Sequence, residues 1–204
     1  MLKNIFIDLV KKFEIDDFKI GKLWVEIEKN YTNKKRFYHN LSHLDNLYLE
    51  LLNVKNEIED WDTLLFTLFY HDIIYKATSK ENEEKSAELA KLRLNEIGFD
   101  EVKVEKCFEQ ILATKLHESS LNKDTNIFID ADLSILGQDW DLYSQYYKNV
   151  RKEYSVYPDF LYNPGQKKVL EHFITMPRIF KTDLFFERFE KKAKINLEKE
   201  LLVL

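Results

Sequence analysis

The chain has 204 residues, a formal net charge of −5 and 45% hydrophobic residues, a composition that excludes wholesale disorder. Only four glycines and three prolines are present, too few for the many tight turns of a β-sandwich or barrel. No long basic tract is present, so binding to duplex nucleic acid is not expected. The single cysteine, Cys107, excludes an intrachain disulfide framework and suits a reducing compartment. The composition therefore predicts an all-α protein.

Apolar residues in the first part of the chain recur every three or four positions. This pattern predicts helices around residues 5–13, 20–27 and 41–52, with a polar loop over 31–36. Residues 61–75 differ, because the run 64–70 is apolar almost all round. Such a helix belongs at the centre of a bundle.

The remainder of the chain continues the helical pattern. We expect helices over residues 82–97, 102–117, 140–154, 167–175 and 185–202. Gly98 is placed as the C-cap of the first of these, and Pro158, Pro164 and Gly165 are expected to break the chain between the third and the fourth. No repeat or linker is visible, which favours a single domain over residues 1–204.

The sequence shows no sign of a membrane span or a signal peptide. Charged residues interrupt residues 1–13, and no run approaches the roughly 18 apolar residues that a bilayer span requires. We therefore expect a cytoplasmic protein without a membrane partner. Cys107 lies in an apolar run and is interpreted as a small buried hydrophobe.

Most histidines lie beside other side chains that bind metals. His39 and His43 are four residues apart, so on a helix they share one face about 5–6 Å apart. The pair could ligate one ion, or one could bind metal while the other faces the substrate. His71-Asp72 ends the most apolar helix, where a divalent cation would satisfy both buried polar groups. The alternative is a structural His–Asp pair or a helix-end cap.

Asp130 and Asp132 interrupt another apolar run. On a helix they point in different directions, so one would serve the site while the other caps or hydrogen-bonds. The alternative is a helix start with acidic residues near the positive end of the dipole. Mixed imidazole and carboxylate ligands suit a transition metal more than calcium. The expected cofactor is a divalent ion: Mn, Fe, Zn, Co, Ni or Mg.

The order His…His-Asp…Asp on an all-helical chain resembles the HD superfamily of metal-dependent phosphohydrolases. Small bacterial members share the segments Tyr-His-Asn-x-x-His, Asn-Glu-x-x-Ser-Ala and Asp-Ala-Asp-Leu-x-x-Leu-Gly. This chain has all three in order, at residues 38–43, 82–87 and 130–137. The resemblance implies one compact helical bundle of the HD type, with a motif core at about 36–137 and a helical extension over 138–204.

The resemblance also implies a function. The expected activity is cleavage of a phosphate ester in a small phosphorylated substrate, with nucleotides among the candidates, by metal-activated water. His43, His71, Asp72 and Asp132 match the metal ligands, with Asp130 as the alternative to Asp132. The first segment is also similar to that of the cyclic-nucleotide phosphodiesterases, which implies that His39 is the general acid. Asp72 would help to orient the water.

Further residues are weaker candidates for the site. Glu83 could act as general base, or it could cap the helix that follows. His117 could be an additional ligand, or it could interact with the dipole at a helix C-terminus. Arg36, Lys115 and Arg151 could bind phosphate, although charged residues on helices are usually only solvated. The rival functions are a non-catalytic metal or nucleotide sensor on the same scaffold, and an interaction module with structural histidines.

Overall fold

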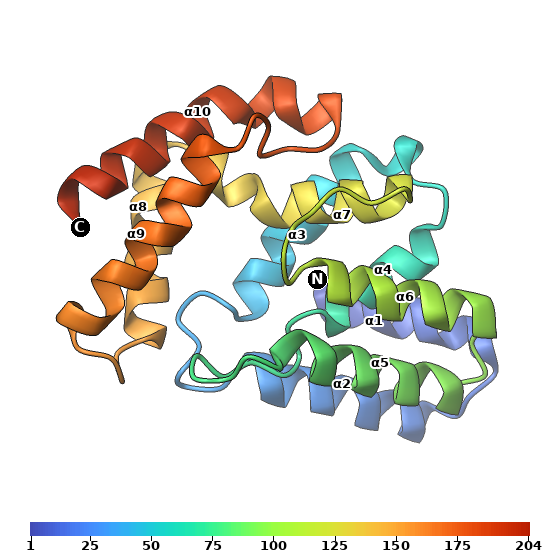
Figure 1. The fold of residues 1–204 in the computed structure, drawn as a ribbon. Coiled ribbons are helices and arrows are strands. Elements are labelled where there is room, and N and C mark those ends of the chain that lie inside the picture. Colours follow the sequence, from blue (N-terminus) through green and yellow to red (C-terminus); the bar gives the residue numbers. More distant parts are fainter. The chain divides into compact units, whose positions relative to one another are not determined.

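The computed structural model describes residues 1–204 and contains ten α-helices, three short 3₁₀ turns and no strand (Figure 1). This confirms the predicted all-α class. The chain forms two compact units, residues 1–128 and 129–204. The sequence predicted a single domain with an extension from residue 138, whereas the boundary between the two units falls inside α7 (Lys123–Leu133). None of the helices combines the length and the apolar run that crossing a membrane requires.

The first unit is built around α4. Its helices are α1 (Leu2–Val10), α2 (Asp17–Tyr31), α3 (Leu41–Asn53), α4 (Trp61–Tyr70), α5 (Asn82–Glu96) and α6 (Glu101–Ala113), with the 3₁₀ turns η1 (Lys11–Phe13) and η2 (Lys55–Glu57). Helix α4 contacts α1, α3, α5 and α6, and all eight residues from Thr63 to Tyr70 are buried. This confirms the central position predicted from its all-round apolar surface. Cys107 of α6 is also fully buried, as predicted.

Local side-chain chemistry sets where several of these helices begin and end. Asp16, Asp60 and Asp100 each accept a hydrogen bond from the backbone N–H three residues later, at 2.8, 3.2 and 3.1 Å. At the other end of α5, Gly98 adopts a left-handed φ of 73° and Phe99 N–H donates to the Leu94 carbonyl. Gly98 is therefore the left-handed glycine that ends the helix, one residue beyond the C-cap Ile97 and not the C-cap itself. The turn brings α5 and α6 side by side (Figure 1).

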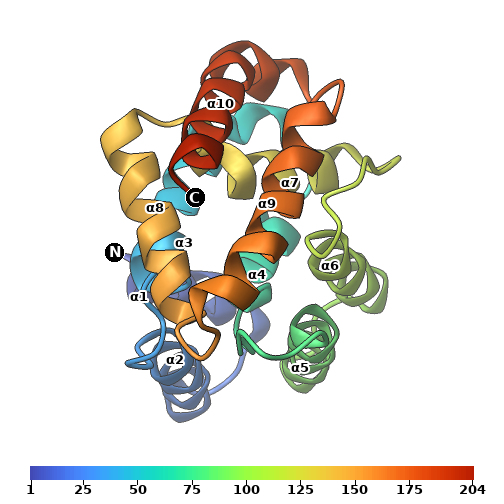
Figure 2. The same ribbon diagram turned by 60° about the vertical axis from the view of Figure 1, so that its left-hand side comes forward.

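The second unit is built around α10. It contains the 3₁₀ turn η3 (Ser134–Gly137) and the helices α8 (Trp140–Glu153), α9 (Asp159–Thr175) and α10 (Asp183–Val203). Helix α10 packs against η3, α8 and α9 (Figure 2). Gly137 allows η3 to lie directly against α10, because a Cβ at residue 137 would lie 2.8 Å from the Cα and the carbonyl oxygen of Phe189. The glycine of the third motif therefore has a packing role.

The predicted chain break at Pro164-Gly165 is wrong, because α9 begins at Asp159 and continues through both residues. A proline in a helix removes the hydrogen bond to the carbonyl four residues earlier. Here that carbonyl belongs to Phe160, in the first turn of the helix, and Phe160 is 75% exposed. Water can satisfy the carbonyl, which explains why the proline is tolerated.

Candidate metal centre

His43 lies in the first turn of α3, and the neighbouring Asn40 determines where that helix begins. The Asn40 Oδ1 atom accepts hydrogen bonds from the backbone N–H groups of Ser42 and His43, at 2.9 and 3.4 Å. Asn40 is therefore the N-cap of α3. Because the cap fixes the first turn, it also fixes the direction of the His43 imidazole, which is buried.

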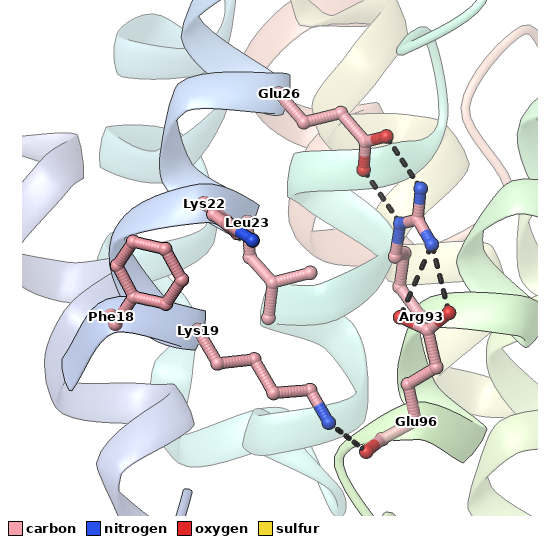
Figure 3. A pocket seen from close by; sticks show the side chains of 7 residues that line it. All are labelled: Phe18, Lys19, Lys22, Leu23, Glu26, Arg93 and Glu96. Atoms are coloured by element: carbon pink, nitrogen blue, oxygen red, sulfur yellow. Dashed lines mark hydrogen bonds and ion pairs between the residues drawn. The ribbon is translucent and has the colours of Figure 1, made fainter. Parts of the chain in front are cut away.

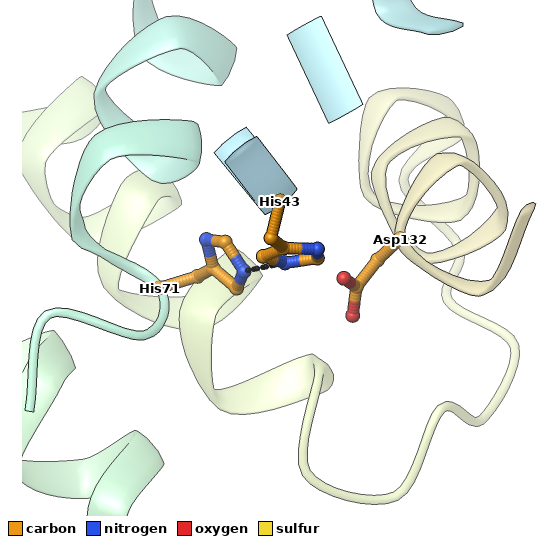
Figure 4. Close-up of side chains that lie close together, drawn as sticks. All are labelled: His43, His71 and Asp132. Atoms are coloured by element: carbon orange, nitrogen blue, oxygen red, sulfur yellow. Dashed lines mark hydrogen bonds between the residues drawn. The ribbon is translucent and has the colours of Figure 1, made fainter. Parts of the chain in front are cut away.

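His71 follows the last residue of α4, and its tautomer can be deduced from its contacts. The Nδ1 atom lies 3.0 Å from the Leu68 carbonyl oxygen, which can only accept a hydrogen bond. Nδ1 therefore carries the proton, and in the neutral ring Nε2 presents a lone pair. That Nε2 atom lies 3.2 Å from the Nε2 atom of His43 (Figure 4).

Asp72 brings a carboxylate to the same point. Its Oδ2 atom lies 3.3 Å from His71 Nε2 and 3.9 Å from His43 Nε2, and its side chain is 17% exposed. Burial acts to raise the pKa of Asp72, but His71, followed by His39 and His43, outweighs burial and holds this pKa well below its usual range. The carboxyl group is therefore ionised, and one of its oxygens faces two imidazole nitrogens.

This arrangement fits a shared cation. A carboxylate beside an imidazole lone pair is repulsive unless a proton or a metal ion lies between them. Two nitrogen ligands about 2.1 Å from one transition-metal ion lie about 3.0 to 3.4 Å apart in octahedral or tetrahedral geometry. The 3.2 Å between the two Nε2 atoms falls in that range. The Nδ1–carbonyl bond of His71 is also typical of a histidine that ligates metal.

Asp132 lies on α7, four residues after Phe128. The Phe128 ring contacts the His71 ring edge-on, with 5.4 Å between the centroids. Residues four apart share one face of a helix about 5–6 Å apart, so the continuous helix carries Asp132 one turn beyond this contact.

Asp130, the alternative last ligand, has different partners. Its Oδ1 atom accepts a hydrogen bond from Lys181 N, and its Oδ2 atom accepts from both the backbone N and the Oγ1 of Thr182, all at 2.7 Å. Burial raises the pKa of Asp130 although these bonds act to lower it. Both oxygens are engaged in holding the turn before α10.

His39 lies in the loop before α3 and is half-buried. Its ring stacks on Tyr75, with 4.2 Å between the centroids and 26° between the planes, and its centroid is 5.9 Å from that of His43. The Tyr38 ring packs against the His39 ring in a T-shaped arrangement. His39 is therefore a neighbour of the candidate ligands with a restrained ring orientation.

The three cations considered for phosphate binding all have other partners. The Arg36 guanidinium donates to backbone carbonyls. Lys115 binds the Glu84 carboxylate and the carbonyl of residue 80. Arg151 donates to Asp159 and to two carbonyls beyond the end of α8. None of these contacts supports a role in phosphate binding.

Glu83 lies at the start of one helix, and His117 lies after the end of the next. Glu83 occupies the first turn of α5 and is half-buried. His117 follows α6 with a φ of 51°, a left-handed conformation that is uncommon for residues other than glycine.

The residues after Asp72 form no regular structure, yet side chains hold their backbone; we call residues 72–76 the ligand strap. Ser86 Oγ accepts from Ile74 N–H at 3.0 Å and donates to the Ile74 carbonyl at 3.2 Å. Asn82 makes the same pair of bonds to Lys76, both at 3.1 Å. The sequence motif pointed to Asn82 and Ser86 only through a family resemblance and did not predict this role. Their i, i+4 spacing on one helix was the available signal.

Comparisons with protein-family models, with curated proteins and with solved structures found no match. The side chains of this chain and their contacts are therefore the basis for proposing a function.

Proposed function

We propose that the protein is a metal-dependent phosphohydrolase that cleaves a phosphate ester, as the resemblance of its motifs to the HD superfamily implies. His43, His71, Asp72 and Asp132 would hold the divalent cation. The observation that carries the proposal is the convergence of two imidazole nitrogens and one carboxylate oxygen, with separations of 3.2 and 3.3 Å. A cation held there would polarise a phosphoryl oxygen and lower the pKa of a coordinated water.

The neighbouring side chains support a division of roles. His39 lies next to His43, and its stack on Tyr75 restrains the ring in one orientation. It would donate a proton to the leaving oxygen of the ester. Asp72, which is ionised and only partly exposed, would accept a hydrogen bond from the attacking water and orient it. Glu83 stays a candidate general base.

The substrate class follows from charge. With a net charge of −5 and no basic tract, the chain favours a small phosphorylated molecule over a nucleic acid duplex. Nucleotides are among the candidates, because the phosphate ester is the group that the proposed chemistry requires.

The test combines metal analysis with an activity screen. The protein, purified without a histidine tag, is analysed for stoichiometric Mn, Fe, Co, Ni or Zn and then assayed on phosphorylated metabolites with each ion and with Mg²⁺. The His39→Gln variant should lose turnover and keep its metal, whereas Asp72→Asn should lose both. Activity that survives Asp72→Asn would refute the proposal. Metal binding without turnover on any substrate would favour a sensor.

A further inference from the structure

Arg36 is a nearly buried arginine whose partners are backbone carbonyls. It is 9% exposed and forms no ion pair with a carboxylate. One terminal nitrogen donates to the carbonyls of Asp72 and His39, at 2.7 and 3.1 Å, and the other donates to the Ile73 carbonyl at 2.8 Å. Burying a guanidinium is costly unless its donors are satisfied. Here three hydrogen bonds from the guanidinium go to the two segments that carry the candidate ligand and the candidate general acid.

Tyr31 completes the arrangement from the last residue of α2. Its ring lies against the Arg36 guanidinium, 4.9 Å from the guanidinium carbon to the ring centroid, and Tyr75 lies at 5.5 Å. The Tyr31 hydroxyl oxygen accepts the Asp72 N–H at 3.2 Å. The backbone of Asp72 is therefore held at both its N–H and its carbonyl.

Holding both groups restricts rotation about the backbone bonds on either side of the Asp72 Cα. That restriction determines where the carboxylate points, and a 1 Å error there would separate its oxygen from the two Nε2 atoms. We propose that Arg36 and Tyr31 are positioning residues that direct the Asp72 carboxylate into the metal centre. The inference rests on the proposed function. It also explains the need for arginine, because lysine lacks the planar fork that reaches successive carbonyls.

The test uses two variants and two matched controls. Arg36→Lys removes the fork but keeps the charge, and Tyr31→Phe removes the acceptor of the Asp72 N–H. Arg93→Lys is the control for the first, because Arg93 of α5 also forms a fork, to Glu26 at 2.8 and 2.7 Å (Figure 3). Tyr143→Phe is the control for the second, because its buried hydroxyl donates to Glu200. Each protein is titrated with Mn²⁺ in a calorimeter, and its helix content and thermal midpoint are recorded.

Arg36→Lys should weaken Mn²⁺ affinity by about 10–100-fold, as is usual for residues that support metal ligands. Tyr31→Phe should weaken it by about fivefold, the effect of one neutral hydrogen bond. Both controls should lower the thermal midpoint but leave the affinity within about twofold of the wild type, since neither contacts the strap. Turnover of bis(p-nitrophenyl) phosphate at saturating Mn²⁺ should fall only in the first two variants.

Wild-type Mn²⁺ affinity in a folded Arg36→Lys variant would overturn the positioning role. If that variant does not fold, unchanged affinity in Tyr31→Phe would overturn it instead. A wild-type protein that binds no Mn²⁺ would overturn both the proposed function and this inference. A wild-type protein that binds Mn²⁺ but hydrolyses no ester, with affinity reduced in Arg36→Lys, would refute the enzyme and support the positioning role.

Discussion

Replacing Asp72 by asparagine should cost much more stability with a bound metal ion than without one. In the metal-free protein the Asp72 carboxylate lies 3.3 Å from His71 Nε2, and the neighbouring histidines hold its pKa below the usual range. A carboxyl group whose pKa is lower in the folded protein than in the unfolded chain stabilises the fold above that pKa. Asparagine has nearly the same shape without the charge, so in excess EDTA the Asp72→Asn variant should be slightly less stable than the wild type.

With Mn²⁺ the difference in stability between the variant and the wild type should grow. An ion at about 100 times its dissociation constant stabilises the native state by about 2.7 kcal/mol. If losing the carboxylate weakens binding about 100-fold, the same concentration stabilises the variant by only about 0.4 kcal/mol. The difference of about 2.3 kcal/mol corresponds to about 5–9 °C in the thermal midpoint of a chain of this size.

Thermal unfolding followed by circular dichroism, in EDTA and in Mn²⁺, measures both effects. Asp130→Asn is the matched control, because Asp130 binds the 181–182 turn and not the candidate ligands. It should lower the midpoint equally in both conditions. An equal Mn²⁺-dependent rise in wild type and Asp72→Asn would show that the carboxylate does not bind the ion, and the reasoning would fail.

Three further predictions concern the scaffold. In urea unfolding, Gly137→Ala should lower the free energy of unfolding by about 1–3 kcal/mol, because the new Cβ would lie 2.8 Å from the Phe189 backbone. The control Gly21→Ala should raise it by about 0.5–1 kcal/mol, because Gly21 is inside a helix and its new Cβ would meet nothing within 4 Å. Burial raises the pKa of Glu200 above its ordinary 4.5. Between the two pKa values the folded protein keeps a proton that the unfolded chain releases, so the free energy of unfolding should fall as the pH rises from 4.5 through the pKa of the folded protein. A Glu200→Gln variant should show a flatter profile, and equal slopes would contradict this. Cys107, whose pKa burial raises to about 12, should react with a thiol reagent only on unfolding; fast labelling of the native protein would contradict it.

Periodicity predicted the helices well and their ends less well. The all-round apolar surface of residues 64–70 was enough to place α4 at the centre, because only a buried helix can carry such a surface. The same helix was expected to end in His71-Asp72, and its last residue is Tyr70. Beyond it, the carbonyls of residues 72–74 and 76 accept from side chains of Arg36, Ser86 and Asn82. Bonds between residues distant in sequence leave no periodic signal.

The residue types predicted the candidate ligands, but they could not choose between the two late aspartates. Asp130 and Asp132 are both in α7, and each is a plausible ligand by chemistry alone. The partners of Asp130 lie about fifty residues away, in the turn before α10. Their backbone N–H groups have no side-chain signature, so only the fold assigns that carboxylate to the turn.

The strap explains why a segment without any candidate ligand accompanies the histidine motifs. Asn82 and Ser86 share one face of α5 and hold the backbone of Ile74 and Lys76, while Arg36 and Tyr31 hold that of Asp72. The position of the carboxylate therefore depends on α2, on the loop before α3 and on α5, none of which supplies it. A sequence that kept the histidines and Asp72 but lost these supports would keep the ligand pattern and lose the geometry. For that reason, the side chains that hold the strap are as useful as the candidate ligands in judging whether a histidine and aspartate pattern in a sequence forms a metal centre.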